Sequence, residues 1–385
     1  MRQLLRGSRL LRRIRFLPYL ALYRICATLR PVRPDRVLFL SDSHDGFVGN
    51  MRFLRDAVLR ADPSVEVTGV FKRSLASRRS FRDALRLPCL IATSAIIVLD
   101  DFYPLIYRFR IRRGVRLVQI WHAAGAFKQV GHSRAGLPGG PTANSEIHRN
   151  YTDAVVSSSG IVADYAEAFG ISAERVHPWG LPRSDVFFDA DAVAAARERV
   201  RRALGAGGEE RLVLYAPTFR GNGQRSATAA PEADWAGIAR TLGDGWRVAV
   251  RQHPFVRRAA PLQPGVIDAG SVSDMNDLLM AADVLVTDYS SSIFEFALLR
   301  RPVVFFVPDL AEYESARSFY RSFDAYAIGP VVQRAGELAD AIRTATVDDT
   351  RLDEFLAEFA DALDGKSSER IAHELLALRT AEPSG

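Results

Sequence analysis

Short apolar runs alternate with helical patterns along most of this 385-residue chain, and this alternation constrains its fold more than any other feature. The first series of runs is typical of buried strands and comprises residues 36–41, 65–71, 95–100, 116–121 and 153–159. Helical patterns, such as residues 47–61, lie between several of these runs. Strands that alternate with helices favour a parallel sheet that is covered on both faces. The sequence therefore predicts a doubly wound α/β domain.

A second series of apolar runs indicates a second domain of the same type. Its strand-like segments are residues 211–217, 246–253, 283–288 and 302–307. A Gly-rich turn at 205–208 separates the two series, and the chain is long for a single core. We therefore expect a basic segment at 1–30, an N-terminal Rossmann-like domain at 31–207 and a C-terminal one at 208–385. Whether the last helices cross back to the first domain is left open.

The first thirty residues hold eight arginines and no acidic residue. Leu10, Ile14, Leu17 and Ala21 recur at helical spacing, and no apolar run reaches the roughly 20 residues that span a bilayer. Arg24 interrupts the apolar stretch that a signal peptide would need. The pattern predicts a basic amphipathic helix that lies on an anionic membrane surface, and the formal charge of +6 favours the same partner. The alternative is a basic helix packed on the protein's own body.

Composition limits the remaining classes of protein. With 48% apolar and 25% charged residues, the chain is globular in type. Its two cysteines, Cys26 and Cys89, form neither a disulfide framework nor a CxxC site, which suits a reducing compartment. No carboxylate pair or His/Cys cluster has metal-ligand spacing, so no cofactor is firmly implied and a need for a divalent metal is left open. The basic segment lacks interleaved stacking aromatics, so nucleic acid is not an expected partner.

Polar residues gather where the expected strands end, which is where open parallel sheets bind ligands. They are small, hydroxylated or titratable, and comprise Ser41, Asp42, Ser43, His44, His122, Pro217, Thr218, Arg220, His253, Asp288, Tyr289, Ser290, Ser291 and Ser292. A chain that used these loops only as connections would not need such a set.

In the first domain, His122 follows the run at 116–121 and precedes a Gly-containing loop. A histidine at a strand end can serve as a general base, while the alternative is a core histidine beside Trp121. Asp42, His44 and Asn50 lie in the loop and helix after the first strand, and Lys128 lies in the loop after His122. We expect these four residues to bind an acceptor, with ordinary loop polarity as the alternative.

In the second domain, the segment from Asp288 onwards reads as a strand end, a turn with Ser290, Ser291 and Ser292, and a helix. Free backbone N–H groups and hydroxyls at a helix start favour phosphate, although plain N-capping would use the same residues. Glu295 lies about one turn further on, where a carboxylate could accept hydrogen bonds from ribose hydroxyls.

Four more polar residues of the second domain follow or end strands. They are Thr218, Arg220, Arg251 and His253. Arginine offers a planar fork that suits phosphate, and histidine can donate to a phosphate oxygen. We therefore expect these residues to bind a phosphorylated donor, with a hydrogen-bonded histidine at the sheet edge as the alternative reading of His253.

Five segments of the chain are, in order, WHAAGAFKQVGHS, LPRSDVFF, LYAPTFR, RQHP and TDYSSSIFEFALLRRPVVFFVPDLAEYESARSFY. Together, and in this order, they resemble the CDP-glycerol glycerophosphotransferase family of teichoic acid synthesis. The similarity extends over roughly residues 35 to 375. It implies a GT-B fold, in which two Rossmann-like domains face a central cleft. It also implies peripheral attachment to the cytoplasmic face of the cell membrane.

The resemblance also implies roles for particular residues. His122 resembles the catalytic base and His253 a ligand of the donor diphosphate, while Asp288 and residues 290–292 match the element that holds this diphosphate. Glu295 resembles a ribose-binding acid, although some relatives have Asp at that position. This chain has Ala123 where many relatives have Gly.

The implied reaction is attack by an acceptor hydroxyl on the β-phosphorus of CDP-glycerol, with release of CMP. A histidine base typically contributes about 10²- to 10⁴-fold to such a rate. The implied partners are CDP-glycerol or CDP-ribitol, a lipid-linked saccharide or glycerol phosphate acceptor, and the membrane surface. A ribitolphosphotransferase, a GT-B glycosyltransferase that uses a nucleotide sugar, and a non-enzymatic membrane scaffold are the alternatives. The sequence leaves open the alditol, the number of units added and the oligomeric state.

Overall fold

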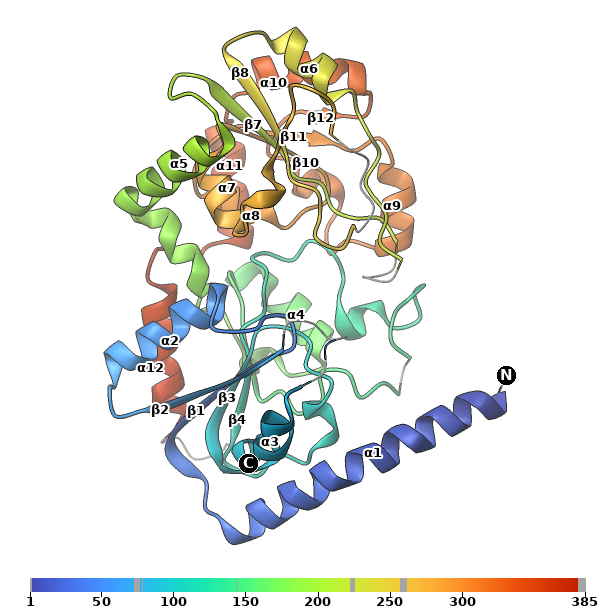
Figure 1. Cartoon of the computed structure of the whole chain (residues 1–385), viewed down its shortest axis with the longest axis vertical. Helices are drawn as coiled ribbons and strands as arrows, with labels where there is room; N and C mark the ends of the chain where they lie inside the picture. The colour runs from blue at the N-terminus through green and yellow to red at the C-terminus, as the bar shows by residue number, and fades with distance from the viewer. Residues whose placement is uncertain are drawn as a thin grey trace.

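A computed structural model describes residues 2–72, 77, 79–142, 144–221, 226–256 and 262–379, with side chains from residue 16 onwards. Two parallel sheets of six strands each form the centres of two domains, which Figure 1 shows one above the other. The strand order is β2-β1-β3-β4-β5-β6 in the first sheet and β12-β11-β10-β7-β8-β9 in the second. The predicted pair of doubly wound α/β domains is confirmed.

The strands of the first sheet are β1 (Arg33–Ser41), β2 (Glu66–Phe71), β3 (Ser94–Leu99), β4 (Arg116–Gln119), β5 (Asp153–Val155) and β6 (Val176–His177). Those of the second are β7 (Arg211–Tyr215), β8 (Trp246–Val250), β9 (Ile267–Asp268), β10 (Val284–Thr287), β11 (Val303–Phe306) and β12 (Val331–Val332). The helices are α1 (Arg2–Leu29), α2 (Gly49–Ala61), α3 (Phe81–Thr93), α4 (Val162–Phe169), α5 (Ala190–Leu204), α6 (Trp235–Leu242), α7 (Met275–Ala281), α8 (Ser292–Ala297), α9 (Leu310–Arg317), α10 (Leu338–Thr344), α11 (Asp349–Phe359) and α12 (Ser367–Leu378).

Alternate side chains of the strands enter different cores, as a pleated sheet requires. In β1, Val37 and Phe39 pack with α2 and α12 on one face, whereas Leu38 and Leu40 pack with α1 and α3 on the other. Because both faces are buried, the strands are apolar throughout rather than alternating in polarity, which explains the continuous runs in the sequence.

The chain passes from the first sheet to the second through α5, which ends at Gly205 in the left-handed conformation (φ +67°). The chain also returns, because Ile371 and Leu375 of α12 are buried against the first sheet. Figure 1 shows α12, coloured red, beside α2. The C-terminal helix therefore belongs structurally to the first domain.

The largest core extends across the junction of the two domains. It contains Trp121 and Phe127 of the first domain together with Phe294, Tyr326 and Phe359 of the second part of the chain. The ring centroids of Phe127 and Tyr326 lie 4.0 Å apart in a stacked arrangement. Such a shared core holds the facing edges of the two sheets in a defined orientation.

Helix α1 lies beside the first domain, as Figure 1 shows, and from Phe16 onwards it has buried and exposed side chains. Phe16 and Tyr23 enter the core, whereas Leu17, Ile25 and Leu29 are 57%, 54% and 75% exposed. Within the described residues, no helix combines the length and apolarity needed to cross a bilayer.

A disulfide between Cys26 and Cys89 joins α1 to α3. This pair differs from the expectation that the cysteines form no disulfide. The two residues are 63 positions apart, and only the packing of α1 against α3 brings their Cα atoms to 5.2 Å. The spacing of the two cysteines along the chain does not indicate that they lie close together in the fold.

Candidate active site

A cavity of about 600 Å³ lies between the two domains. Its wall includes His122 and Lys128 from the first domain, and Phe219 and Arg317 from the second. The loops after β4 and β7 supply His122, Lys128 and Phe219, so both sheets direct strand ends to this space, which we call the central cleft. Doubly wound sheets bind ligands at such edges.

The turn that carries His122 is strained and held by two amide side chains. Trp121 has φ +50°, in the left-handed region that bulky residues rarely adopt. Its N–H donates to Oε1 of Gln119 at 2.9 Å, and its carbonyl accepts from Nδ2 of Asn50 at 3.0 Å. Such a backbone conformation costs about 1–3 kcal/mol and persists where its surroundings impose it. The result is that the Trp121 ring is buried while the His122 side chain remains 47% exposed at the cleft.

Asp101, two residues after the end of β3, lies beside the His122 ring. Its Oδ1 lies 3.6 Å from Nδ1 of His122. The carboxylate is fixed in turn, since Oδ2 accepts from Oγ of Ser43 at 2.7 Å and Oδ1 accepts from the N–H of Phe102 at 2.6 Å. A carboxylate on this side favours a proton on Nδ1, which leaves Nε2 as the basic nitrogen. His122 thus has the geometry of a general base with an orienting acid.

A second carboxyl group, Asp100, lies buried beside this pair. Burial raises its pKa to about 7, with the negative charge of Asp101 acting in the same direction and a hydrogen bond from Ser41 opposing it. Nε2 of His44 lies 3.6 Å from Oδ2 of Asp100. Burial also lowers the pKa of His44. The structure therefore places His44 on the same loop cluster as His122.

Lys128 lies where the two domains are hydrogen-bonded through their backbones. The N–H of Gln129 donates to the carbonyl of Ser318 at 3.1 Å, and the N–H of Tyr320 donates to the carbonyl of Phe127 at 3.1 Å. The ammonium group of Lys128 lies 5.4 Å from the centroid of the Tyr313 ring. The positive charge of this loop is thereby held at the wall of the central cleft.

His253 is neutral at physiological pH and borders the same region. Burial, together with the positive charges of Lys128 and Arg251, lowers its pKa to about 4. Its Nδ1 accepts from the N–H of Phe255 at 3.1 Å, and its ring lies 4.7 Å from that of Phe219, which lines the cleft. Because Nδ1 accepts, a neutral ring carries its proton on Nε2 and can donate there.

Asp288 and Arg220 are engaged in a network at the ends of β7 and β10. Asp288 accepts from the N–H of Thr218 at 2.8 Å, the N–H of Tyr289 at 2.7 Å and Nη1 of Arg220 at 2.8 Å. Arg220 also forms a bidentate pair with Asp309, with distances of 2.6 and 3.0 Å. These contacts fix the loops around the cleft. Asp288 and Arg220, both predicted to bind the donor, are therefore bound to other protein groups in the structure.

The three serines after β10 form a compact turn. Oγ of Ser290 lies 2.7 Å from Oγ of Ser292 and accepts from the N–H of Ser292 at 3.3 Å. Ser290 and Ser291 are half-buried, and α8 after them is only six residues long. The hydroxyls, rather than a long helix, are what this turn can offer to a phosphate.

Glu295 and Asn50 are joined through Arg183, a residue that the sequence alone did not single out. The guanidinium of Arg183 donates twice to the carboxylate of Glu295, at 2.8 and 2.7 Å. The backbone N–H of Arg183 donates to Oδ1 of Asn50 at 3.0 Å. Glu295 is 3% exposed, so contact with a ribose would require this pair to open. Arg183 thus connects α2 to α8 across the domains, with its backbone bound to Asn50 and its side chain bound to Glu295.

Two other predicted ligands also have protein partners. Arg251 donates to the carbonyls of Ala269, at 3.0 Å, and Val272. Asp42 forms ion pairs with Lys72, at 3.2 Å, and Arg79, at 2.7 Å. Among the described residues, no group of three or more His, Cys, Asp or Glu side chains could hold a metal ion.

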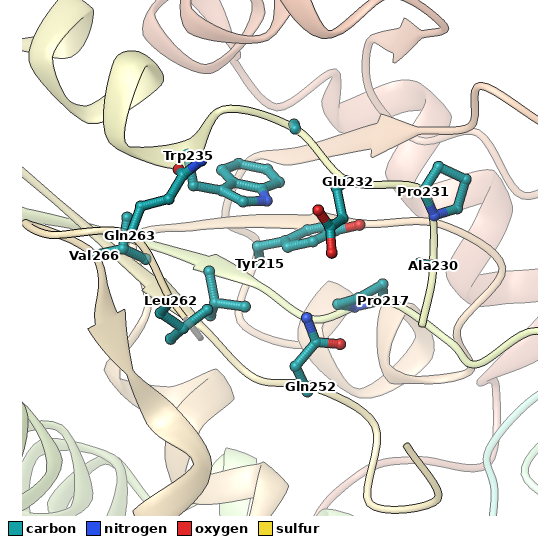
Figure 2. A pocket seen from close by; sticks show the side chains of 12 residues that line it. Tyr215, Pro217, Ala230, Pro231, Glu232, Trp235, Gln252, Leu262, Gln263 and Val266 are labelled. Carbon is teal, nitrogen blue, oxygen red and sulfur yellow. The ribbon is translucent and has the colours of Figure 1, made fainter. Parts of the chain in front are cut away.

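A second cavity lies in the C-terminal domain, at the ends of β7 and β8. Figure 2 shows the rings of Tyr215 and Trp235, together with Leu262 and Gln252, around its opening. The two ring centroids lie 4.1 Å apart. Oε1 of Gln252 is buried and has no hydrogen-bond partner among the described residues. Gln252 lines this cavity and is followed directly by His253, one of the expected phosphate ligands.

Asp101, Arg183 and Asp309 are the acidic and basic residues that sequence reasoning missed. Asp101 follows β3, Arg183 lies in the segment after β6, and Asp309 follows β11. The rule that pointed to His122 and His253, namely to look just beyond each strand, would have found Asp101 and Asp309. It could not have shown which of these side chains face one another.

Comparisons with known proteins give a consistent result. The sequence pattern of the CDP-glycerol:poly(glycerophosphate) glycerophosphotransferase family matches residues 22–377. A teichoic acid poly(ribitol-phosphate) polymerase of Bacillus spizizenii is 39% identical over 360 residues, which cover 92% of this chain and 58% of that protein. A teichoic acid ribitol-phosphate primase of the same organism is 33% identical over 364 residues, or 91% of this chain and 93% of that protein.

A solved structure of the H548A variant of the wall teichoic acid polymerase TagF has the same fold. It superposes with a TM-score of 0.76 at 18% identity, covering 100% of this chain and 99% of the other. The resemblance and the GT-B arrangement predicted from the sequence are thus confirmed. The chain belongs to the CDP-glycerol:poly(glycerophosphate) glycerophosphotransferase family.

Proposed function

We infer that this protein transfers an alditol phosphate from a CDP-alditol to a hydroxyl group of a lipid-linked acceptor, with release of CMP, in the synthesis of teichoic acid or a related polymer. The observation that carries this proposal is His122, oriented by Asp101 and open to the central cleft. Both CDP-glycerol and CDP-ribitol are donors of the required type. The two relatives described above are named as ribitol-phosphate enzymes, so we expect CDP-ribitol to be preferred.

In the proposed reaction, Nε2 of His122 accepts the proton of the acceptor hydroxyl as its oxygen bonds to the β-phosphorus. The bond between this phosphorus and the oxygen that bridges to the α-phosphorus breaks, and CMP leaves with that oxygen. Asp101 stabilises the imidazolium that forms. A base in this role contributes about 10²- to 10⁴-fold.

The second domain would stabilise the charge that develops on the diphosphate. Nε2–H of His253 and the hydroxyls of Ser290 and Ser291 are suitable donors, and the ammonium of Lys128 supplies positive charge nearby. Phosphoryl transfer depends chiefly on positioning and electrostatic stabilisation. The Asp288–Arg220–Asp309 network keeps these loops in place.

The cavity in Figure 2 is the site that we assign to the cytosine base. Tyr215 and Trp235 offer flat apolar surface, and the side-chain amide of Gln252 can pair with the amino group and ring nitrogen of cytosine. A buried amide oxygen without a partner is costly, and a ligand donor would remove that cost.

We further propose that α1 rests on the anionic cytoplasmic leaflet of the membrane. Its outer face exposes Leu17, Ile25 and Leu29 next to Arg24 and Arg30, a combination of apolar and basic side chains that suits such a surface. Co-sedimentation with vesicles of phosphatidylglycerol should fall after deletion of residues 1–30, and should fall with added salt in the intact chain. Unchanged sedimentation after the deletion would reject this attachment.

The central experiment measures CMP release from CDP-ribitol and CDP-glycerol with a synthetic lipid-linked acceptor. We expect release with at least one donor and a loss of at least 10²-fold in His122→Ala. His373→Ala is the matched control, because His373 is exposed and lies on α12. Sugar transfer from UDP- or GDP-sugars, or full CMP release by His122→Ala, would contradict the proposal.

A further inference from the structure

Gln119, the last residue of β4, lies between the backbone segments that carry His122 and Asp101. It is fully buried, at 0% exposed. Its Oε1 accepts from the N–H of Trp121 at 2.9 Å, and Trp121 directly precedes His122. Its Nε2 donates to the backbone carbonyl of Asp101 at 3.2 Å. One buried amide group therefore joins the backbone of the base to the backbone of the acid beside it.

These two contacts fix the direction of the Gln119 amide. If the amide were turned by half a rotation, Nε2 would face the N–H of Trp121, and Oε1 would face the carbonyl of Asp101. Two donors and two acceptors would then oppose each other inside the protein, where a polar group without a partner is costly. Only one orientation of this side chain is therefore compatible with its surroundings.

Two buried tyrosines extend the network away from the central cleft. Nε2 of Gln119 also donates to the hydroxyl of Tyr151 at 2.8 Å, and the hydroxyls of Tyr151 and Tyr107 lie 2.9 Å apart. Because Tyr151 accepts from Gln119, its own proton can be donated to Tyr107, which in turn accepts from the N–H of Tyr103 at 3.4 Å. Burial raises the pKa of Tyr151 and that of Tyr107, so both hydroxyls keep their protons. Both hydrogens of the Gln119 amide are thus engaged.

The distance between His122 and Asp101 makes the placement of the two backbones critical. Nδ1 of His122 lies 3.6 Å from Oδ1 of Asp101, which is just beyond the range of a hydrogen bond. A shift of either backbone by a fraction of an ångström would make or lose this bond. On the His122 side, the backbone is the turn at Trp121, whose φ of +50° persists only where its surroundings impose it.

We propose that Gln119 is a positioning residue of the transfer reaction, which holds His122 and Asp101 at the separation that lets them act together as the base. This role rests on the function proposed above. Gln119 is buried and does not line the central cleft, so it acts through these two residues rather than on a substrate. Tyr151 and Tyr107 keep its amide in place.

Steady-state CMP release by Gln119→Met and Tyr151→Phe tests this role. Gln119→Met keeps the length of the side chain and removes both contacts, so kcat should fall by about 10- to 10²-fold while KM for the donor stays the same. Tyr151→Phe removes one hydrogen bond from the amide, and kcat should fall by about 2- to 10-fold. Tyr23→Phe is the matched control, because it removes a tyrosine hydrogen bond to the carbonyl of Arg110, next to α1, and should leave kcat unchanged. Melting temperatures identify any variant that fails to fold.

A double variant separates positioning from a general loss of structure. If Gln119 acts through the pair, Gln119→Met/Asp101→Asn should lose clearly less of kcat than the product of the two single losses. A loss equal to that product would mean that the two residues act independently, and it would overturn the proposal. An unchanged kcat in Gln119→Met would overturn it as well.

Nitrogen-15 NMR of histidine-labelled protein gives a readout that does not depend on activity. At about pH 9, where histidine rings are neutral, we expect His122 to carry its proton on Nδ1, beside Asp101. Gln119→Met should show a mixture of the two tautomers, whereas Tyr23→Phe should not. His122→Ala identifies the signals among those of the seven histidines. An unchanged tautomer in Gln119→Met would overturn the proposal, whereas a chain that shows this tautomer shift but releases no CMP would contradict only the proposed function.

Discussion

His122 and Asp101 show what position along the chain can and cannot reveal about single residues. His122 was predicted because it follows an apolar run, and strand ends face ligands in doubly wound sheets. Asp101 also follows such a run, but its importance depends on the adjacency of β3 and β4 in the sheet. That adjacency is a property of the fold, so the pair could only be recognised in three dimensions.

The Asp101→Asn variant tests the orienting role of this carboxylate. The variant keeps the size of the side chain and removes the charge that, in the proposed reaction, stabilises the His122 imidazolium, so we expect kcat to fall by about 10- to 10³-fold with little change in KM for the donor. The measurement is CMP release as a function of pH. Asp244→Asn, at an exposed position, should leave kcat unchanged. A loss of kcat/KM that came entirely from a higher KM for the donor, with kcat unchanged, would contradict an orienting role.

The raised pKa of Asp100 predicts that the free energy of unfolding depends on pH. Its pKa is raised to about 7 in the folded state, whereas an unfolded Asp ionises near its ordinary value of 3.8. Between these values the folded state binds more protons, so this group's contribution is present below about pH 4 and is lost as pH rises towards 7. At 1.36 kcal/mol per pKa unit, the loss is at most about 4 kcal/mol.

Urea unfolding of Asp100→Asn and of the unmodified chain at pH 4.5 and pH 7.5 would measure this effect. The variant cannot ionise at this position, so its free energy of unfolding relative to the unmodified chain should rise between the two pH values. The same difference at both pH values would exclude a raised pKa for Asp100.

At the scale of elements, the nine apolar runs of the sequence each contain a strand, whereas the two-residue strands β6, β9 and β12 were not predicted. The run at 153–159 becomes strand only over β5, because the hydroxyls of Ser157 and Ser158 donate to carbonyls of Phe359 and Glu358. These partners lie about 200 residues away, at the end of α11. A local pattern of β-prone residues contains no information about such a partner, so the end of the strand could not be placed from it.

In the loop after His122, Gly125 meets two requirements, a positive φ angle and a close approach to the Phe294 ring. Gly125 has φ +63°, and a Cβ atom there would lie 2.4 Å from the ring of Phe294 in α8. Gly136 has φ +84°, but a Cβ atom there would meet nothing within 4 Å. Gly125→Ala should therefore reduce the free energy of unfolding by clearly more than the roughly 1 kcal/mol expected for Gly136→Ala.

Urea unfolding of both variants gives the comparison. The difference between them measures the close approach of the first domain to α8, because both positions have positive φ. Equal losses would mean that the loop and the Phe294 ring can move apart without cost.

At the scale of the whole molecule, the two domains are held by a common core and by an ion pair in which the Glu295 side chain is buried and the Arg183 side chain is 29% exposed. Arg183 and Glu295 were not recognised as partners from the sequence, because they are 112 residues apart and belong to different domains. Their pairing also explains why Glu295 is an acid in an otherwise apolar helix, in which Ile293, Phe294 and Phe296 are fully buried.

Glu295→Gln should lower the free energy of unfolding by about 3 kcal/mol, since it leaves the guanidinium of Arg183 without its partner. The double variant Arg183→Met/Glu295→Gln removes both charges and should be more stable than Glu295→Gln alone. Chemical unfolding of the two variants and of Arg183→Met completes the cycle. Additive losses in the double variant would show that the two side chains do not interact.

The return of α12 to the first sheet has a consequence for how the molecule comes apart. The backbone passes between the lobes once through α5 and again before α12, so one break does not free either half. A protease that cut only in the turn at 205–208 would give two bands on a denaturing gel. Under native conditions the fragments should still elute from a sizing column as one species, because α12 keeps the C-terminal fragment packed on the first sheet.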